Sequence, residues 1–141
     1  MTCPSRFELF DHTADIGVRV FAPTLTELVA PAVAGLYAVI GALVPSGPVA
    51  ETRFSFSGAE PALLLRDYLA ELLRLFDAER RMVTAVAAEE FDRERLTVVG
   101  QMRAVDMSAS ELEREAKAVT YHRLELRPVA GGYEATFIVD I

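Results

Sequence analysis

The first half of the chain alternates between strand-like and helix-like hydrophobic patterns. Short apolar runs at residues 7–10 and 16–21 predict two strands, with a turn over 11–15 between them. A capping box over residues 24–27 then predicts the start of a helix, because apolar residues recur after it at helical spacing. Pro31 falls inside this helical pattern, so we expect a kink or a displaced first turn there.

The rest of the chain predicts a strand, a long helix and four further strands. Alternation over residues 52–57 indicates a strand with one buried face, and a strong apolar stripe indicates a helix that begins near Pro61. The four further strands are expected at 82–91, 95–105, 116–127 and 133–139. The order ββαβαββββ predicts an α+β fold: one compact domain over residues 1–141, with a largely antiparallel or mixed sheet and two main helices.

Composition adds limits on compartment and partners. The chain has 141 residues, 52% of them hydrophobic, with a net charge of -7 and a pI near 4.8. An acidic surface repels a phosphate backbone, so we expect no strong direct nucleic-acid binding, although such a protein can dock onto a basic nucleic-acid enzyme. Cys3 is the only cysteine, and neither a signal-peptide pattern nor an apolar run of membrane-spanning length is visible. We therefore expect a cytoplasmic protein that does not enter a membrane, with self-association left open.

The usual catalytic motifs are absent from the sequence. It contains no GxGxxG, GxxxxGK[ST], HExxH or GxSxG pattern. Dinucleotide, P-loop, zincin and α/β-hydrolase chemistry therefore lack their usual residues, and independent catalysis is not expected.

Two acidic features could bind a cation. Residues 11–15 place Asp11, His12 and Asp15 in a predicted turn, where carboxylates can bind a hard cation or form an ordinary Asx turn. Asp140 adjoins the α-carboxylate of Ile141, and together they concentrate four oxygens that suit Ca²⁺ or Mg²⁺. Such a concentration of charge normally marks only an exposed chain end.

The predicted strand over 116–127 carries three further polar or aromatic candidates. Lys117 and Tyr121 would share one face of such a strand and His122 the other, so Lys117 and His122 would not form a dyad. We interpret Tyr121 as a core or cross-strand packing residue and Lys117 as a solvated charge.

Five short motifs, in order along nearly the whole chain, together resemble the archease family. They are HTADIG at 12–17, LLRLFD at 72–77, KAVTYH at 117–122, GGYEA at 131–135 and IVDI at 138–141. The resemblance implies a small α+β accessory protein of the RtcB-type RNA ligase, which joins 2′,3′-cyclic-phosphate or 3′-phosphate RNA ends to 5′-hydroxyl ends in tRNA splicing and RNA repair. Such a protein promotes guanylylation and multiple turnover of the ligase and is not itself an enzyme.

The resemblance also implies a divalent cation, expected to be Ca²⁺ with Mg²⁺ or Mn²⁺ as alternatives. Carried onto this sequence, its ligands would be Asp15, Asp140 and Ile141, while His12, Lys117 and His122 would contact the partner or support the site. Two other functions compete with this one. The first is a chaperone-like modulator of RNA-modifying enzymes that needs no metal; the second is a hydrolase using Asp15 and His12, for which the sequence offers no positioned nucleophile.

Overall fold

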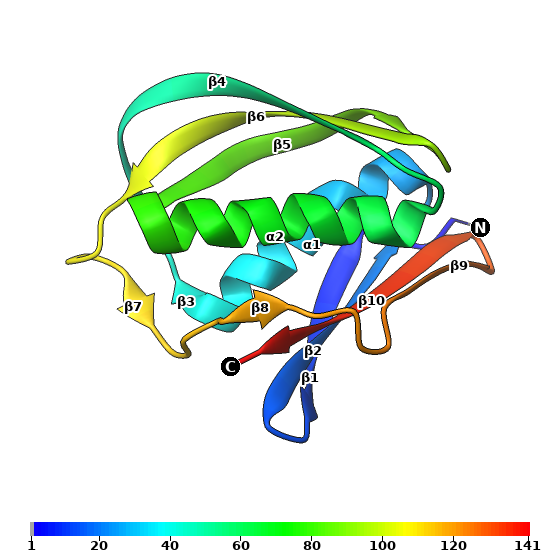
Figure 1. The fold of residues 1–141 in the computed structure, drawn as a ribbon, viewed down its shortest axis with the longest axis horizontal. Helices are drawn as coiled ribbons and strands as arrows, with labels where there is room; N and C mark the ends of the chain where they lie inside the picture. Colours follow the sequence, from blue (N-terminus) through cyan, green and yellow to red (C-terminus); the bar gives the residue numbers. More distant parts are fainter. Residues whose placement is uncertain (1) are drawn as a thin grey trace.

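A computed structural model describes residues 2–141 and shows two helices packed between two antiparallel sheets (Figure 1). The helices are α1 (Leu25–Ile40) and α2 (Pro61–Glu79). The first sheet contains β1 (Arg6–His12), β2 (Asp15–Ala22), β10 (Gly132–Asp140), β8 (Ala118–Val119) and β9 (Glu125–Val129), with β8 and β9 both paired to β10. The second contains β4 (Pro45–Ser57), β6 (Arg95–Val105) and β5 (Arg81–Phe91), and a short pair joins β3 (Gly41–Ala42) to β7 (Glu111–Leu112). The α+β class and the two main helices are confirmed.

The hairpin of β1 and β2 is longer than the hydrophobic pattern predicted. The two strands stay paired beyond the apolar residues, as far as His12 opposite Asp15. The turn therefore contains only Thr13 and Ala14. The expected turn over 11–15 was therefore too long, because polar side chains at a sheet end still pair through their backbones. Ala14 takes a left-handed φ of 60°, which closes the short turn.

Local signals located the starts of both helices correctly. The Thr24 hydroxyl accepts a hydrogen bond from the Glu27 N–H at 3.3 Å, and α2 begins at Pro61. Pro31 lies inside α1, which is assigned as one continuous helix, so the displaced first turn is not found. Because proline lacks an N–H, α1 loses one backbone hydrogen bond, the one that residue 31 would donate to the Glu27 carbonyl.

The predicted strand over 116–127 was wrong, because the chain turns in its middle. The Leu124 N–H donates to the Tyr121 carbonyl at 3.3 Å, and Arg123 has a left-handed φ of 52°. The turn separates β8 from β9, which pair with different parts of β10. The predicted strand over 52–57 also proved longer, since β4 starts at Pro45 and contains an irregularity between Ser46 and Ala50.

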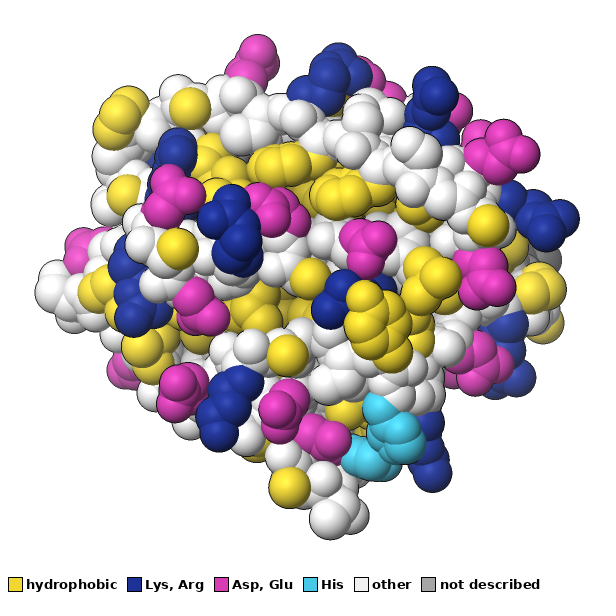
Figure 2. All heavy atoms as spheres, viewed as in Figure 1, with side chains coloured by type: hydrophobic (Ala, Val, Ile, Leu, Met, Phe, Trp, Pro, Cys, Tyr) yellow, Lys and Arg dark blue, Asp and Glu magenta, His cyan; other side chains and the backbone are white. Residues whose placement is uncertain are grey.

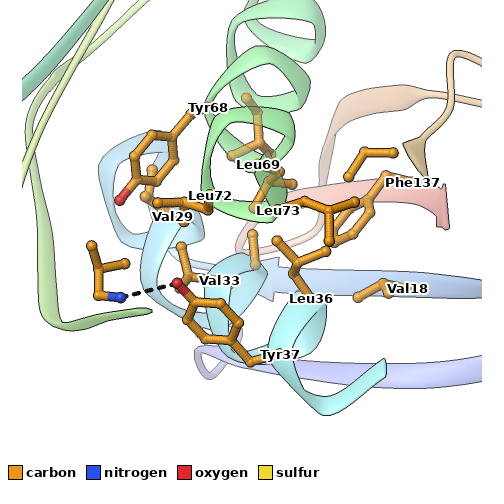
Figure 3. Packing of buried hydrophobic residues seen from close by; sticks show 14 of the residues in the cluster. Val18, Val29, Val33, Leu36, Tyr37, Tyr68, Leu69, Leu72, Leu73 and Phe137 are labelled. Atoms are coloured by element: carbon orange, nitrogen blue, oxygen red, sulfur yellow. Dashed lines mark hydrogen bonds between the residues drawn. The ribbon is translucent and has the colours of Figure 1, made fainter. Parts of the chain in front are cut away.

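The hydrophobic core fills the space between the helices and the two sheets (Figure 3). Leu36 of α1 and Leu69 of α2 are fully buried, and Val18 and Phe137 cover the inner face of the first sheet. The Tyr37 hydroxyl accepts a hydrogen bond from the Val83 N–H at 3.0 Å, and burial raises the pKa of Tyr37 to about 12. Each large apolar side chain buried in this way contributes about 1.5–3 kcal/mol, so the core fixes how the sheets and helices face each other. Within residues 2–141, no helix combines the length and apolarity that a membrane span requires.

Candidate functional site at the end of the first sheet

Asp15 and Asp140 are direct partners across β2 and β10. Directly opposite residues of an antiparallel pair project from the same face, with Cβ atoms about 4.5–5.5 Å apart. Asp15 is partly buried, its side chain 18% exposed, whereas Asp140 is exposed. The fold thus brings the acidic turn and the acidic chain end together, and two like charges at this separation repel each other unless something neutralises them.

The two histidines of the chain lie beside these carboxylates. The His12 Nδ1 is 2.5 Å from the Asp15 Oδ1, and the two residues are also register partners at the end of the hairpin. The His122 ring is tilted against the His12 ring, with 5.5 Å between the centroids. Both rings appear together in cyan in Figure 2. His12 therefore orients the Asp15 carboxylate, and His122 supports His12 from the loop that follows β8.

Lys117 is joined to the site through its backbone. Its N–H donates to the Asp140 carbonyl at 2.7 Å, while its side chain is exposed. The Ile141 side chain packs against the core and so fixes the chain next to Asp140. The structure accordingly places all six predicted site residues at one end of the first sheet.

The candidate ligands are of the type that a hard divalent cation prefers, but they are few. Asp15 and Asp140 supply carboxylate oxygens, the type of ligand that a hard cation prefers. Residues 2–141 contain no cluster of three or more His, Cys, Asp and Glu side chains arranged to hold a metal ion. A Ca²⁺ ion takes six to eight oxygens, so water or a partner molecule would have to supply several of its ligands.

An apolar patch borders the carboxylates on the same face. The next pair along β2 and β10 is Gly17 with Ile138, and Ile138 is fully buried although it projects away from the core between the sheets. A side chain at Gly17 would collide with the Phe10 ring, which therefore lies across this glycine. Phe10 and Ile138 thus form an apolar patch next to the two carboxylates.

The remainder of this sheet face is electrically balanced by its own ion pairs. Glu8 accepts from Arg19 at 2.8 Å and from Arg6 at 3.0 Å, and these two hydrogen bonds hold the pKa of Glu8 below its usual value. Arg19 and Arg127 pair with Glu134 at 3.2 and 2.8 Å. Within residues 2–141, Asp15 and Asp140 are thus the carboxylates of this face that pair with no arginine.

The sequence matches the family described as "Archease protein family (MTH1598/TM1083)" over residues 7–141. The chain belongs to the archease family. The archease of Archaeoglobus fulgidus is 30% identical over 136 residues, covering 96% of this chain and 99% of that protein. The archease of Methanosarcina acetivorans is 33% identical over 143 residues, with 96% of each chain covered.

Solved structures agree with this assignment. The solution structure of Methanobacterium thermoautotrophicum protein 1598 has a TM-score of 0.72 and 28% identity, covering 96% of this chain and 98% of that chain. The crystal structure of a Thermotoga maritima protein described as an archease and possible chaperone has a TM-score of 0.66 and 20% identity, covering all of this chain and 98% of that one. At this identity, the second likeness concerns the fold alone.

Two features near the site were missed or misjudged from the sequence. Tyr121, expected to pack in the core or across a strand, is 62% exposed, because the turn after β8 carries it outward. Lys117 is the only lysine in a chain with 14 Lys and Arg residues together. This preference for arginine over lysine can be read in the sequence, and it makes Lys117 stand out. A lysine differs from an arginine in being a compact, mobile point charge.

Proposed function

We propose that this archease is a non-catalytic accessory protein that activates an RtcB-type RNA ligase by promoting its guanylylation. It would do so with a divalent cation held by Asp15, Asp140 and Ile141. Membership of the family supports this proposal, and the observation that carries it is the pairing of Asp15 with Asp140. Two carboxylates set side by side at a sheet end repel each other, and a bound cation would remove that repulsion.

Each residue of the site has a distinct role in this proposal. A bound divalent cation would neutralise charge on a transferring phosphate. His12 holds the Asp15 carboxylate in one orientation through the 2.5 Å contact, and His122 restrains the His12 ring. Because the Lys117 N–H holds the Asp140 carbonyl, the end of β10 keeps its register, and the Lys117 ammonium stays free to meet a phosphate or a carboxylate of the partner.

The test is multiple-turnover joining of a 3′-phosphate RNA to a 5′-hydroxyl RNA by the cognate ligase, with GTP and Mn²⁺. We expect wild type to stimulate joining, and Asp15→Asn and Asp140→Asn to lower the maximal stimulation at least tenfold while staying folded. Asp11→Asn is the matched control, because Asp11 is an exposed carboxylate of β1 that pairs with Ile16 and faces the opposite side of the sheet. Equal stimulation by all four proteins would refute the role of the carboxylates.

A chaperone-like function is the second candidate; the Thermotoga maritima protein, which shares this fold, is described as a possible chaperone. Such a protein would keep an RNA-modifying enzyme in solution without using a cation. The same variants separate the two functions when enzyme aggregation on heating is followed by light scattering. Suppression of aggregation that is unchanged by Asp15→Asn, Asp140→Asn and EDTA, without stimulation of the ligase, would favour the chaperone.

A further inference from the structure

An exposed tyrosine beside the candidate site is held in place by one arginine. The Arg66 guanidinium lies over the Tyr121 ring, with Cζ 4.2 Å from the ring centroid, and its Nη1 donates to the Tyr121 hydroxyl at 2.9 Å. The Arg66 Nε donates to the Val119 carbonyl at 2.9 Å, which ties the same guanidinium to strand β8. The Arg66 side chain is only 19% exposed, whereas Tyr121 is 62% exposed, more than any other large hydrophobic residue within 2–141. A large aromatic side chain thus projects into solvent in a fixed position.

A groove runs beside this pair, between α2 and β8. Its volume is about 460 Å³, and its apolar lining is formed by Ala70, Leu73, Ala78, Ala118 and Val119. Arg66, Arg74, Lys117 and the carboxylate of Asp77 also line it. We call these nine residues, together with Tyr121 and Leu63, the α2–β8 surface.

Leu63 extends the apolar part of this surface along the helix. It is 39% exposed and lies one turn before Arg66, on the same face of α2. Figure 2 shows hydrophobic, basic and acidic side chains interspersed over α2, on the face that also presents the two histidines.

The composition and rigidity of the α2–β8 surface suit a protein partner. Tyrosine and arginine dominate the residues that carry binding energy at protein interfaces. Binding loses less entropy when a side chain is already fixed, and Arg66 fixes Tyr121 before any partner arrives. The exposed edge of β8 is partly blocked by Arg66 at the Val119 carbonyl, which disfavours simple addition of another strand at that point.

We propose that the α2–β8 surface docks a protein segment of the ligase that carries an aliphatic or aromatic side chain next to a carboxylate. This inference rests on the function proposed above and names the surface that the partner contacts. The apolar side chain would pack between Tyr121 and Leu63, and the carboxylate would meet the Lys117 ammonium.

Charge and position both favour this occupant. Asp77 lies in the same groove, and Arg66 and Arg74 pair with Asp67 and Glu71, so Lys117 is the basic side chain there that a partner can meet. Lys117 forms no ion pair with any residue in the described part of the chain, so its charge is available to a partner. Since the Lys117 backbone is bonded to Asp140, a segment bound here would lie next to the carboxylates and bring the ligase to them.

The experiment titrates this protein into the cognate ligase during multiple-turnover RNA joining and separates affinity from maximal effect. We expect Tyr121→Ala to raise the half-saturating concentration at least tenfold and leave the stimulation at saturation unchanged. Arg66→Lys should raise it less, since it keeps the charge but weakens the hold on Tyr121. Asp140→Asn should instead lower the stimulation at saturation without changing the half-saturating concentration.

Leu112→Ala is the matched control, because Leu112 is 50% exposed and lies on β7, away from the α2–β8 surface. An unchanged half-saturating concentration for Tyr121→Ala, with wild type active, would overturn the docking surface and leave the proposed function standing. Absence of stimulation by wild type would overturn the proposed function and the docking proposal with it.

Two further measurements exclude other occupants. Fluorescence anisotropy with a labelled single-stranded RNA should show no binding that depends on Tyr121; a matching loss of RNA affinity in Tyr121→Ala would overturn the protein-segment proposal in favour of RNA. Sedimentation of the protein alone should give the same species for wild type and Tyr121→Ala. Dissociation caused by the substitution would overturn the proposal in favour of a second copy of this chain.

Discussion

Phe10 on β1 lies across Gly17 on β2 and occupies the space that a side chain at Gly17 would need. The glycine thereby lets the ring rest on the sheet beside the Asp15 and Asp140 pair. The glycine of the HTADIG motif is thus explained by packing, and the motif combines a structural residue with two that face the candidate site.

Replacing Gly17 should disturb this packing. We expect Gly17→Ala to lower the free energy of unfolding by about 1–3 kcal/mol, because the new methyl group collides with the Phe10 ring. Urea unfolding followed by circular dichroism measures the change. In a Phe10→Ala background the same substitution should cost much less, and equal costs in both backgrounds would contradict the packing explanation.

The Asp15 and Asp140 pair should reverse its effect on stability when a cation is supplied. In EDTA we expect Asp140→Asn to be as stable as wild type or more stable, because it removes a like-charge repulsion. With millimolar Ca²⁺, wild type should gain thermal stability and Asp140→Asn should not, since only the former binds the ion tightly. Thermal unfolding with and without Ca²⁺ measures this, and equal gains in both proteins would argue against Asp140 as a ligand.

The turn between β1 and β2 should tolerate glycine better than alanine. Ala14 has a φ of 60°, a left-handed conformation that costs an L-residue about 1–2 kcal/mol. Glycine removes this cost but is more flexible in the unfolded chain, which offsets part of the gain. Ala14→Gly should therefore raise the free energy of unfolding by about 0.5 kcal/mol. Ala34→Gly, at an exposed position of helix α1, should lower it by about 1 kcal/mol. Destabilisation by both substitutions would show that the left-handed conformation at Ala14 carries no strain.

Asp77 should make stability depend on pH in the direction opposite to most carboxylates. Burial raises the pKa of Asp77, and the nearby Glu115 raises it further, while Arg80 opposes both. Because the folded-state pKa of Asp77 lies above the usual 3.8, ionisation of Asp77 destabilises the folded protein. This destabilisation disappears as the pH falls below 3.8, where Asp77 is protonated in both states. Asp77→Asn should therefore be more stable than wild type at pH 7, with a difference that vanishes near pH 3. Urea unfolding across this range measures it; a difference that does not change with pH would contradict the shift.

Local patterns in the sequence were sufficient for several elements. The capping residues at Thr24, the proline at the first turn of α2 and the apolar stripe that follows it depend on neighbours within a few positions. The hairpin of β5 and β6 was predicted within one residue at each end, because alternation and a polar turn mark it directly. Such signals act over one or two turns of chain and need no knowledge of the rest.

The break between β8 and β9 could not be read in this way. Apolar and polar residues alternate over 116–127 as they would in one strand. In the structure, however, β8 pairs with one end of β10 and β9 pairs with the other. Tyr121, in the turn between them, was therefore assigned to packing when it is exposed and held by Arg66 of a distant helix. Intrinsic strand preference yields to tertiary context when backbone pairing decides the outcome.

The sequence by itself determined the α+β class, both helices and the residue types of the candidate site, because these follow from local periodicity, capping and side-chain chemistry. Only the tertiary structure decided that two sheets enclose the helices, that Asp15 faces Asp140, and that Arg66 supports Tyr121. Those relationships join residues far apart in the chain. Long-range strand pairing and burial of the shared core bring them together, and no local pattern specifies which distant residues will meet.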